Sequence, residues 1–211
     1  MENYYNKFIE LLEKEDRYEC IKFVKKLLDE KVVDVVELYE KIITPSINKI
    51  ECKLSEKNIC TWQEHIRSGI VRTVIEFCYT YVVEQKKSTK NEKVVVLCPE
   101  EEYYDLEARM ITDLFSIEGY ESIFVGSNTP KSDFLSVIDY IIPKYVIIDV
   151  TDYYNIVSAK KYVDSIKEKV RNSIKIYASG SAFKTEENMY KKIGADGYIE
   201  TYQDIKEIGG I

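Results

Sequence analysis

The second half of the chain alternates short β-rich runs with helix-like stretches, and no other feature constrains the fold as strongly. Runs rich in Val, Ile and Tyr have the length of buried strands, at 94–98, 122–126, 145–150, 174–179 and 197–200. Apolar residues with helical spacing follow each run, at 105–118, 131–142, 155–170, 184–193 and 201–208. Strands joined by helices form a parallel sheet that is covered on both faces. We therefore predict a flavodoxin-like, five-stranded parallel sheet with the strand order 2-1-3-4-5.

The first part of the chain has helical periodicity throughout and predicts a four-helix bundle. Its apolar stripes repeat at spacings of three and four residues, and they begin near Phe8, Cys20, Val35 and Ile66. Asp34 precedes the third stripe in the position of a helix cap, and Pro45 predicts a kink in the same helix. We expect Trp62, near the start of the last helix, to lie in the core of the bundle.

The change of period marks two domains. We place the helical bundle at 1–86, a linker at 87–92 and the α/β domain at 93–211. The linker segment contains no apolar residue, which is typical of a connection between two folded parts.

Charge and cysteine content exclude several classes of protein. The net charge of −7 argues against general nucleic-acid binding, which needs basic patches. No apolar run approaches the roughly 20 residues that span a membrane, and the acidic, amphipathic start does not resemble a signal peptide. The five cysteines are odd in number and form no C-x-x-C pair, so we expect free thiols in the cytoplasm and no metal site built from cysteine alone.

The predicted sheet places a candidate ligand site at the carboxyl ends of its strands. The loops after Cys98, Asp149 and Ser179 meet there. The first of them, in "CPEEEYYDLEARM", has no glycine and would repel a phosphate. Its acids, together with Asp149 and Ser179, partly match a phosphoacceptor receiver, but the fifth strand ends in "GYIET" without the lysine that phosphoryl chemistry needs.

Three stretches together resemble the cobalamin-binding family, in which a helical cap precedes a flavodoxin-like domain. "ITPSINKIECKLSEKNICTWQEHIRS" is similar to the cap motif that ends in Glu-His-x-x-Ser, here Glu64, His65 and Ser68. "EYYDLEARMITDLFSIEGYESIFVGSNTP" is similar to the family's first helix, second strand and Gly-x-Asn-x-Pro turn, here with Gly126 and Asn128. "KKIGADGYIE" is similar to the family's Gly-Ala-Asp-Gly ending.

The resemblance implies a cobalamin at the carboxyl edge of the sheet, with a histidine below the cobalt and the helical cap above the ring. The motif Asp-x-His-x-x-Gly, which supplies that histidine, falls on Glu102, Tyr103, Tyr104, Asp105, Leu106 and Glu107. Tyr104 therefore stands at the position of the cobalt ligand and Glu107 at that of the glycine. A neutral phenol, with a pKa of about 10, is a poor ligand for cobalt.

The resemblance also implies a slot for the nucleotide tail of the cofactor. The Ser-x-Leu motif of this slot falls on Asp149, Val150 and Thr151, and its Gly-Gly motif falls on Ser179 and Gly180. In light-sensing members a tryptophan precedes the cap motif by ten residues, and Leu54 takes that position here. Carboxylates such as Asp149 and Glu107 are costly to bury without partners, so we expect that the tail slot is closed, or that its acids turn away or become protonated when a tail enters.

Two groups of side chains leave alternatives open. His65 is the only histidine, and it either ties the two domains together as a half-buried residue or contacts the upper face of a planar cofactor, where it would be a metal ligand. The tyrosines Tyr103, Tyr104, Tyr153 and Tyr154 either stack on such a ligand or fill the space that a corrinoid occupies in the family.

We predict a non-enzymatic, cytoplasmic corrinoid-binding module that acts as a sensor or regulator, because no catalytic set is present. Its partners would be a planar tetrapyrrole-type molecule, a protein or a second copy of the chain, but neither nucleic acid nor membrane. One alternative is a corrinoid carrier for a methyltransferase system. The other is a degenerate module that binds haem or no cofactor and acts through protein contacts.

Overall fold

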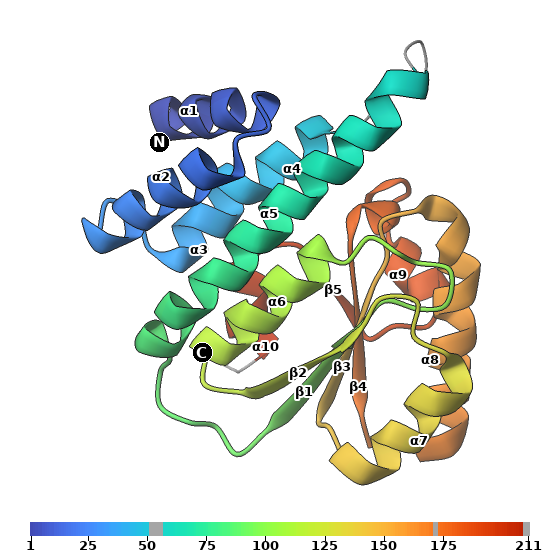
Figure 1. Ribbon diagram of the computed structural model, residues 1–211. Coiled ribbons are helices and arrows are strands. Elements are labelled where there is room, and N and C mark those ends of the chain that lie inside the picture. The colour runs from blue at the N-terminus through green and yellow to red at the C-terminus, as the bar shows by residue number, and fades with distance from the viewer. Residues whose placement is uncertain (51–56, 171–172, 209–211) are drawn as a thin grey trace. The chain divides into compact units, whose positions relative to one another are not determined.

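The computed structural model describes residues 1–50, 57–170 and 173–208, with the side chains of 50 and 57–61 excepted. The chain divides into two compact units, Met1–Glu84 and Gln85–Ile211 (Figure 1). Each unit is described below by itself.

The first unit is helical. Its elements are α1 (Glu2–Glu13), α2 (Arg17–Asp29), α3 (Val35–Leu38), the π-helical segment η1 (Tyr39–Ile43), α4 (Thr44–Ile50) and α5 (Lys57–Gln85). Aspartates cap two of these helices, since Asp16 accepts a hydrogen bond from the Glu19 amide at 3.0 Å and Asp34 accepts one from the Glu37 amide at 2.7 Å. The cap predicted at Asp34 is therefore confirmed.

The two sequence expectations about Pro45 and Trp62 have different outcomes. The π-helical turn η1 directly precedes Pro45, and the Thr44 amide bonds to the Tyr39 carbonyl, five residues earlier. The regular α-helical hydrogen-bond pattern is thus interrupted next to the residue that has no N–H to donate. Trp62 is 49% exposed, so its predicted place in the bundle core is wrong. Among the described side chains of α5, the buried stripe begins at Ile70, eight positions further along the helix.

The second unit is a parallel sheet in the predicted order β2-β1-β3-β4-β5, which confirms the flavodoxin-like fold. Its strands are β1 (Lys93–Leu97), β2 (Glu121–Gly126), β3 (Tyr145–Asp149), β4 (Lys175–Ser179) and β5 (Gly197–Ile199). Strands β1 and β3 are buried along nearly their whole length, as expected for the centre of a doubly covered sheet.

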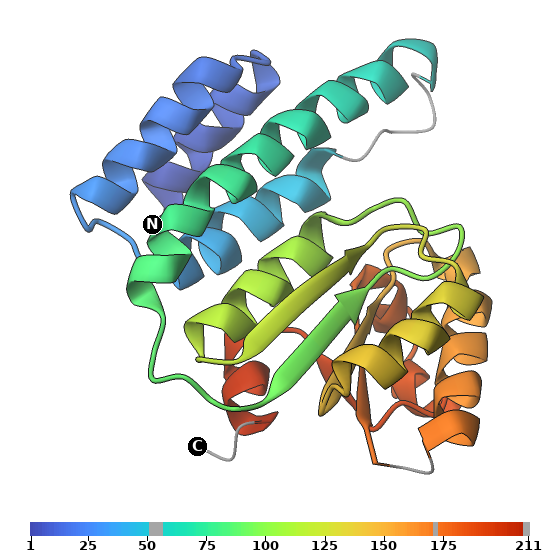
Figure 2. The same ribbon diagram turned by 60° about the horizontal axis from the view of Figure 1, so that its bottom comes forward.

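Helices cover both faces of this sheet (Figure 1; Figure 2). The helices are α6 (Leu106–Ile117), α7 (Lys131–Ile141), α8 (Ile156–Val170), α9 (Met189–Lys192) and α10 (Tyr202–Ile208), with short 3-10 turns at η3 (Tyr153–Asn155) and η4 (Ser181–Lys184). Helices α6 and α10 lie on one face, and α7 and α8 lie on the other, where Phe134 and Tyr162 are fully buried against the strands.

The helix predicted at 184–193 is wrong in its extent. The structure has only the 3-10 turn η4 and the short helix α9 in this region. Asn188 adopts a left-handed conformation with φ +58°, which interrupts a continuous right-handed helix.

Candidate functional site

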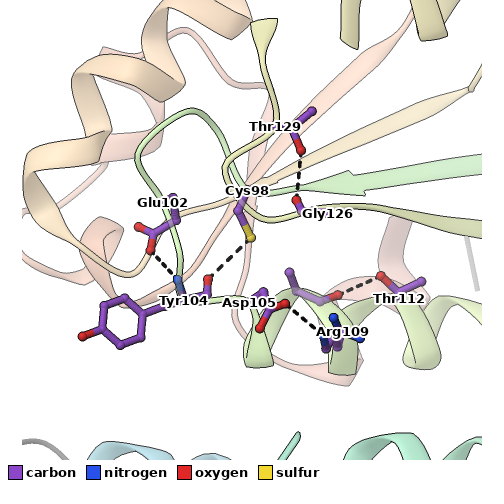
Figure 3. A network of polar contacts seen from close by, with 9 residues as sticks. Cys98, Glu102, Tyr104, Asp105, Arg109, Thr112, Gly126 and Thr129 are labelled. Atoms are coloured by element: carbon purple, nitrogen blue, oxygen red, sulfur yellow. Dashed lines mark hydrogen bonds and ion pairs between the residues drawn. The ribbon is translucent and has the colours of Figure 1, made fainter. Parts of the chain in front are cut away.

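The loop after β1 is held by the side chain of Glu102, which points inward and is fully buried (Figure 3). Its Oε1 accepts a hydrogen bond from the Tyr104 amide at 3.0 Å. The Cys98 thiol adds a contact to the carbonyl oxygen of Tyr104 at 3.5 Å. These bonds set the conformation of the backbone on both sides of Tyr104.

The other carboxylate oxygen of Glu102 reaches the loop after β3. Oε2 accepts hydrogen bonds from the amides of Thr151 at 3.0 Å and Asp152 at 2.9 Å, and from Nδ2 of Asn155 at 3.2 Å. Hydrogen bonds to a buried carboxylate are stronger than those between neutral groups. Glu102 therefore joins the two loops that frame the carboxyl edge of the sheet. Because these hydrogen bonds hold the Glu102 carboxylate inside the protein, it does not point outward, where it could hydrogen-bond to a metal-ligating side chain at position 104.

Four tyrosines project from these joined loops. Tyr103 and Tyr104 follow Glu102, and they are 66% and 49% exposed. Tyr153 and Tyr154 come from η3, are also exposed, and meet edge to face with ring centroids 6.3 Å apart. The ring of Tyr104 points away from its loop (Figure 3). The edge thus presents aromatic surface and phenol groups, and no imidazole.

Asp105 and Arg109 form an ion pair at the start of α6. Asp105 is buried, and one of its carboxylate oxygens lies 3.0 Å from Nε of Arg109, one helical turn away. The Arg109 guanidinium also lies 5.0 Å from the centre of the Phe124 ring. Arg109 therefore neutralises Asp105.

Asp149, at the end of β3, is fully buried. Its Oδ1 accepts a hydrogen bond of 2.8 Å from the Ser179 hydroxyl at the end of β4, while its Oδ2 has no hydrogen-bond partner. Burial raises the pKa of Asp149 well above its ordinary value, and the nearby Glu107 carboxylate raises it further. Burial therefore favours the protonated form of this side chain.

Glu107 and Tyr198 lie near this acid. Burial raises the pKa of the Glu107 carboxyl, the charge of Lys184 opposes the rise, and that of Glu200 adds to it. The Tyr198 hydroxyl donates to the carbonyl oxygen of Gly180 at 3.2 Å, and burial raises its pKa too. Glu107 and Asp149 thus place ionisable groups at two positions where the resemblance implies glycine and serine.

The remaining predicted residues of this edge shape its loops. Gly180 has φ +100°, and a Cβ there would lie 2.1 Å from the carbonyl oxygen of Val150, so the backbone itself requires glycine. Gly126 has φ +140°. The Asn128 side chain accepts a hydrogen bond from the Glu101 amide at 2.9 Å, and the Asn128 amide donates to the Glu102 carbonyl at 2.7 Å.

The predicted residues of the first unit lie on α5. Glu64 and Ser68 are half-buried, and His65 is exposed. Leu54 lies outside the described residues. Within the described parts of the chain, no group of three or more His, Cys, Asp or Glu side chains could hold a metal ion. No helix in those parts is long and apolar enough to cross a membrane.

Asn155 belongs to this site, although the sequence did not single it out. It is buried, and its Nδ2 also donates to the carbonyl oxygen of Glu101 at 3.1 Å. Its position after a "DYY" run gives no local signal of this role, because both acceptors lie more than 50 residues earlier in the chain.

Comparison with known proteins identifies a family match in the α/β unit, which contains the candidate site. Residues 92–205 match the family model described as the B12 binding domain, which covers more than half of the chain. No curated protein matches the sequence.

Solved structures with the same fold include three corrinoid-related proteins. A monomethylamine corrinoid protein from Methanosarcina barkeri has a TM-score of 0.84 at 15% identity, covering 99% of this chain and 97% of that one. A cobalamin-binding protein from Desulfitobacterium hafniense has a TM-score of 0.52 at 17% identity, covering 98% and 97%. A methanol:cobalamin methyltransferase complex from Methanosarcina barkeri has a TM-score of 0.51 at 16% identity, covering 96% and 76%.

Proposed function

Since the chain belongs to the B12-binding domain family, we propose that it binds a corrinoid at the carboxyl edge of its sheet and carries it for a methyltransferase system. The bound corrinoid would supply the methyl-transfer chemistry, and the chain would hold and orient it. In this proposal the protein is a carrier subunit and not itself the catalyst.

The observation that carries the proposal is the platform formed by the loops after β1 and β3. Glu102 joins these loops, and the exposed rings of Tyr103, Tyr104, Tyr153 and Tyr154 project from them. A flat ring can stack on such rings without a metal–protein bond. Tyr104 takes the place of the cobalt-ligating histidine, so we propose that the protein supplies no ligand to cobalt from below.

The tail slot of the family does not fit the side chains that are present. Asp149 is fully buried with an unpartnered oxygen, and its other oxygen is bonded to Ser179 across the ends of β3 and β4. Glu107 adds a second acid where the family has glycine. We therefore propose that the corrinoid binds with its nucleotide tail outside this slot, or is one that has no tail.

The carrier role has more support than the sensor role. Two of the similar folds belong to a corrinoid protein and to a methyltransferase complex, which makes a methyltransferase the protein partner that we propose. The family match supports a corrinoid and offers no support for haem.

Spectroscopy after desalting tests this proposal. We expect the protein to retain hydroxocobalamin and the tail-less corrinoid cobinamide with similar affinity, because the tail contributes no buried contact. Bound cob(II)alamin should keep the electron paramagnetic resonance signature of its own base on cobalt. Retention of neither corrinoid would refute binding at this edge. Retention of cobalamin alone, in a form that has lost its own base, would show that the tail enters the slot.

The carrier role needs its own measurement. Reduced, protein-bound cobalamin is mixed with a purified corrinoid methyltransferase and its methyl donor, and its absorption spectrum is followed. Methylation that exceeds that of free cobalamin at equal concentration supports a carrier. Equal or slower methylation with every methyltransferase tested would favour a regulatory module.

A further inference from the structure

The polar segment 87–92 lies in the second unit, and its backbone is bound to the turn between α6 and β2. The Lys87 amide donates to the carbonyl oxygen of Ile117 at 2.8 Å, and the Lys90 amide donates to that of Gly119 at 2.7 Å. The last four carbonyl groups of a helix have no donor within the helix. Because Ile117 is the last residue of α6, the segment supplies a donor that the end of this helix lacks.

Gly119 allows the two backbones to approach closely. Its φ is +92°, and a Cβ at this position would lie 2.1 Å from the carbonyl oxygen of Ser88. Glycine adopts this left-handed conformation without a steric cost and leaves the space that the Ser88 carbonyl occupies. The segment 87–92 therefore packs on the turn backbone against backbone.

The side chain of Glu118 connects the same segment to the C-terminal helix α10. Glu118 is the capping residue at the end of α6, and its side chain is fully buried. Its Oε1 lies 2.6 Å from Nζ of Lys87 and accepts a hydrogen bond from the hydroxyl of Tyr202. Burial raises the pKa of Glu118, but these hydrogen bonds and the charges of Lys87 and Lys90 outweigh it and lower the pKa. A carboxylate is unfavourable at the negative end of a helix dipole, so the lysines offset its charge there.

The two lysine side chains lie against aromatic rings of the α/β unit. Nζ of Lys87 is 5.7 Å from the centre of the Tyr202 ring, and Nζ of Lys90 is 4.2 Å from the centre of the Tyr120 ring. Residues 86–89 are nevertheless exposed. Polar composition thus reports that the side chains face solvent, although the backbone of the segment is bound.

We propose that segment 87–92 is a fixed part of the α/β unit, and that the hinge between the two units is confined to Lys86 and the end of α5. Helix α5 ends at Gln85, and the contacts of Lys87 and Lys90 described above all lie within the second unit. Each residue has two soft backbone dihedral angles, so a free segment 87–92 would add about twelve of them to the hinge. Binding the segment to α6 and α10 removes these and restricts how one unit can turn relative to the other.

Amide hydrogen exchange of the full chain tests the proposal. In the wild type, the amides of Lys87 and Lys90 should exchange more slowly than in an unstructured peptide of the same sequence. Lys87→Met removes the ion pair with Glu118, and Tyr202→Phe removes the other donor to the same oxygen. In both variants we expect these two amides to exchange at least about threefold faster, while amides of β3 keep their wild-type rates.

Lys93→Met is the matched control. It removes an exposed ion pair between Lys93 and Glu121, 3.7 Å long, just beyond the segment. The amides of Lys87 and Lys90 should keep their wild-type exchange rates in this variant, because none of the contacts that bind the segment is lost.

Trypsin gives an independent readout, because Lys90 is a cleavage site inside the segment. The native wild type should resist cleavage after Lys90, and Lys87→Met and Tyr202→Phe should be cleaved there faster. Mass spectrometry identifies this cut by a new amino terminus at Asn91. Rapid cleavage after Lys90 in the native wild type, or unprotected amides at Lys87 and Lys90, would overturn the proposal. Equal acceleration of the β3 amides in both variants would also overturn it, because the contacts would then stabilise the whole unit and not the segment.

Discussion

The change Glu102→Gln tests the interaction that organises the candidate site. The carboxylate accepts four hydrogen bonds, one from the Tyr104 amide and three from the loop after β3, at 2.9 to 3.2 Å. Glutamine has only one acceptor oxygen. In the more favourable orientation of the glutamine side-chain amide, the oxygen faces the three donors of the loop after β3, and the NH₂ group faces the N–H of Tyr104.

The cost follows from these contacts. Leaving one buried donor without an acceptor costs about 1–3 kcal/mol, and three charge-assisted bonds become weaker neutral ones. The smaller desolvation cost of a neutral side chain offsets part of this loss. We expect the free energy of unfolding of the α/β unit to fall by about 2–4 kcal/mol, which is less than the ~5–15 kcal/mol stability of a typical domain. The variant should therefore still fold.

Urea unfolding and amide hydrogen exchange measure the effect. Exchange should accelerate at Thr151 and Asp152, whose amides lose a charged acceptor. Glu101→Gln is the matched control, because it removes the same charge one residue earlier from an exposed side chain. A Glu102→Gln variant with wild-type stability and wild-type exchange at Thr151 would refute the role of this carboxylate.

Three further predictions concern the same edge. The folded-state pKa values of Asp149 and Glu107 are raised above their ordinary values of 3.8 and 4.5, so the folded unit binds more protons than the unfolded chain. The stability that these two carboxyl groups contribute is fully present below their ordinary pKa values and is lost as pH rises through their folded-state pKa values. Urea midpoints measured as a function of pH should show this decline. The Asp149→Asn variant should show a smaller decline. Gly180→Ala should cost more than about 1 kcal/mol of unfolding free energy in thermal or urea melts, because its φ is left-handed and its Cβ meets backbone; a neutral result would mean that the loop moves freely. Tyr104→His should add a protein nitrogen ligand to bound cob(II)inamide, which has no base of its own, seen by electron paramagnetic resonance, whereas Tyr103→His should not; the same unchanged spectrum from both would place the cobalt elsewhere.

Much of the fold follows from local pattern. The five strands occur within one residue of their predicted ends, because a short apolar run between polar turns identifies a buried strand without knowledge of its neighbours. The predicted helices at 105–118 and 131–142 also match α6 and α7 closely. The family could be identified from motif order for the same reason, since motifs are local strings of residues.

Errors arose where a local pattern depended on distant packing. Trp62 fits an apolar helical stripe, but the buried stripe of α5 starts later. The helix predicted at 184–193 has suitable residues, but the left-handed conformation of Asn188 breaks it.

The sequence by itself determined the sheet, its order and the replacement of the cobalt-ligand histidine by Tyr104. Only the tertiary structure decided what the surrounding acids do. The Glu102 carboxylate accepts hydrogen bonds from amides of the loop after β3, about fifty positions further along the chain. Asp149, at the end of β3, accepts a hydrogen bond from Ser179, at the end of β4. Side-chain periodicity is a property of neighbours in sequence, whereas the partner of a buried charge is whichever donor the fold brings within about 3 Å.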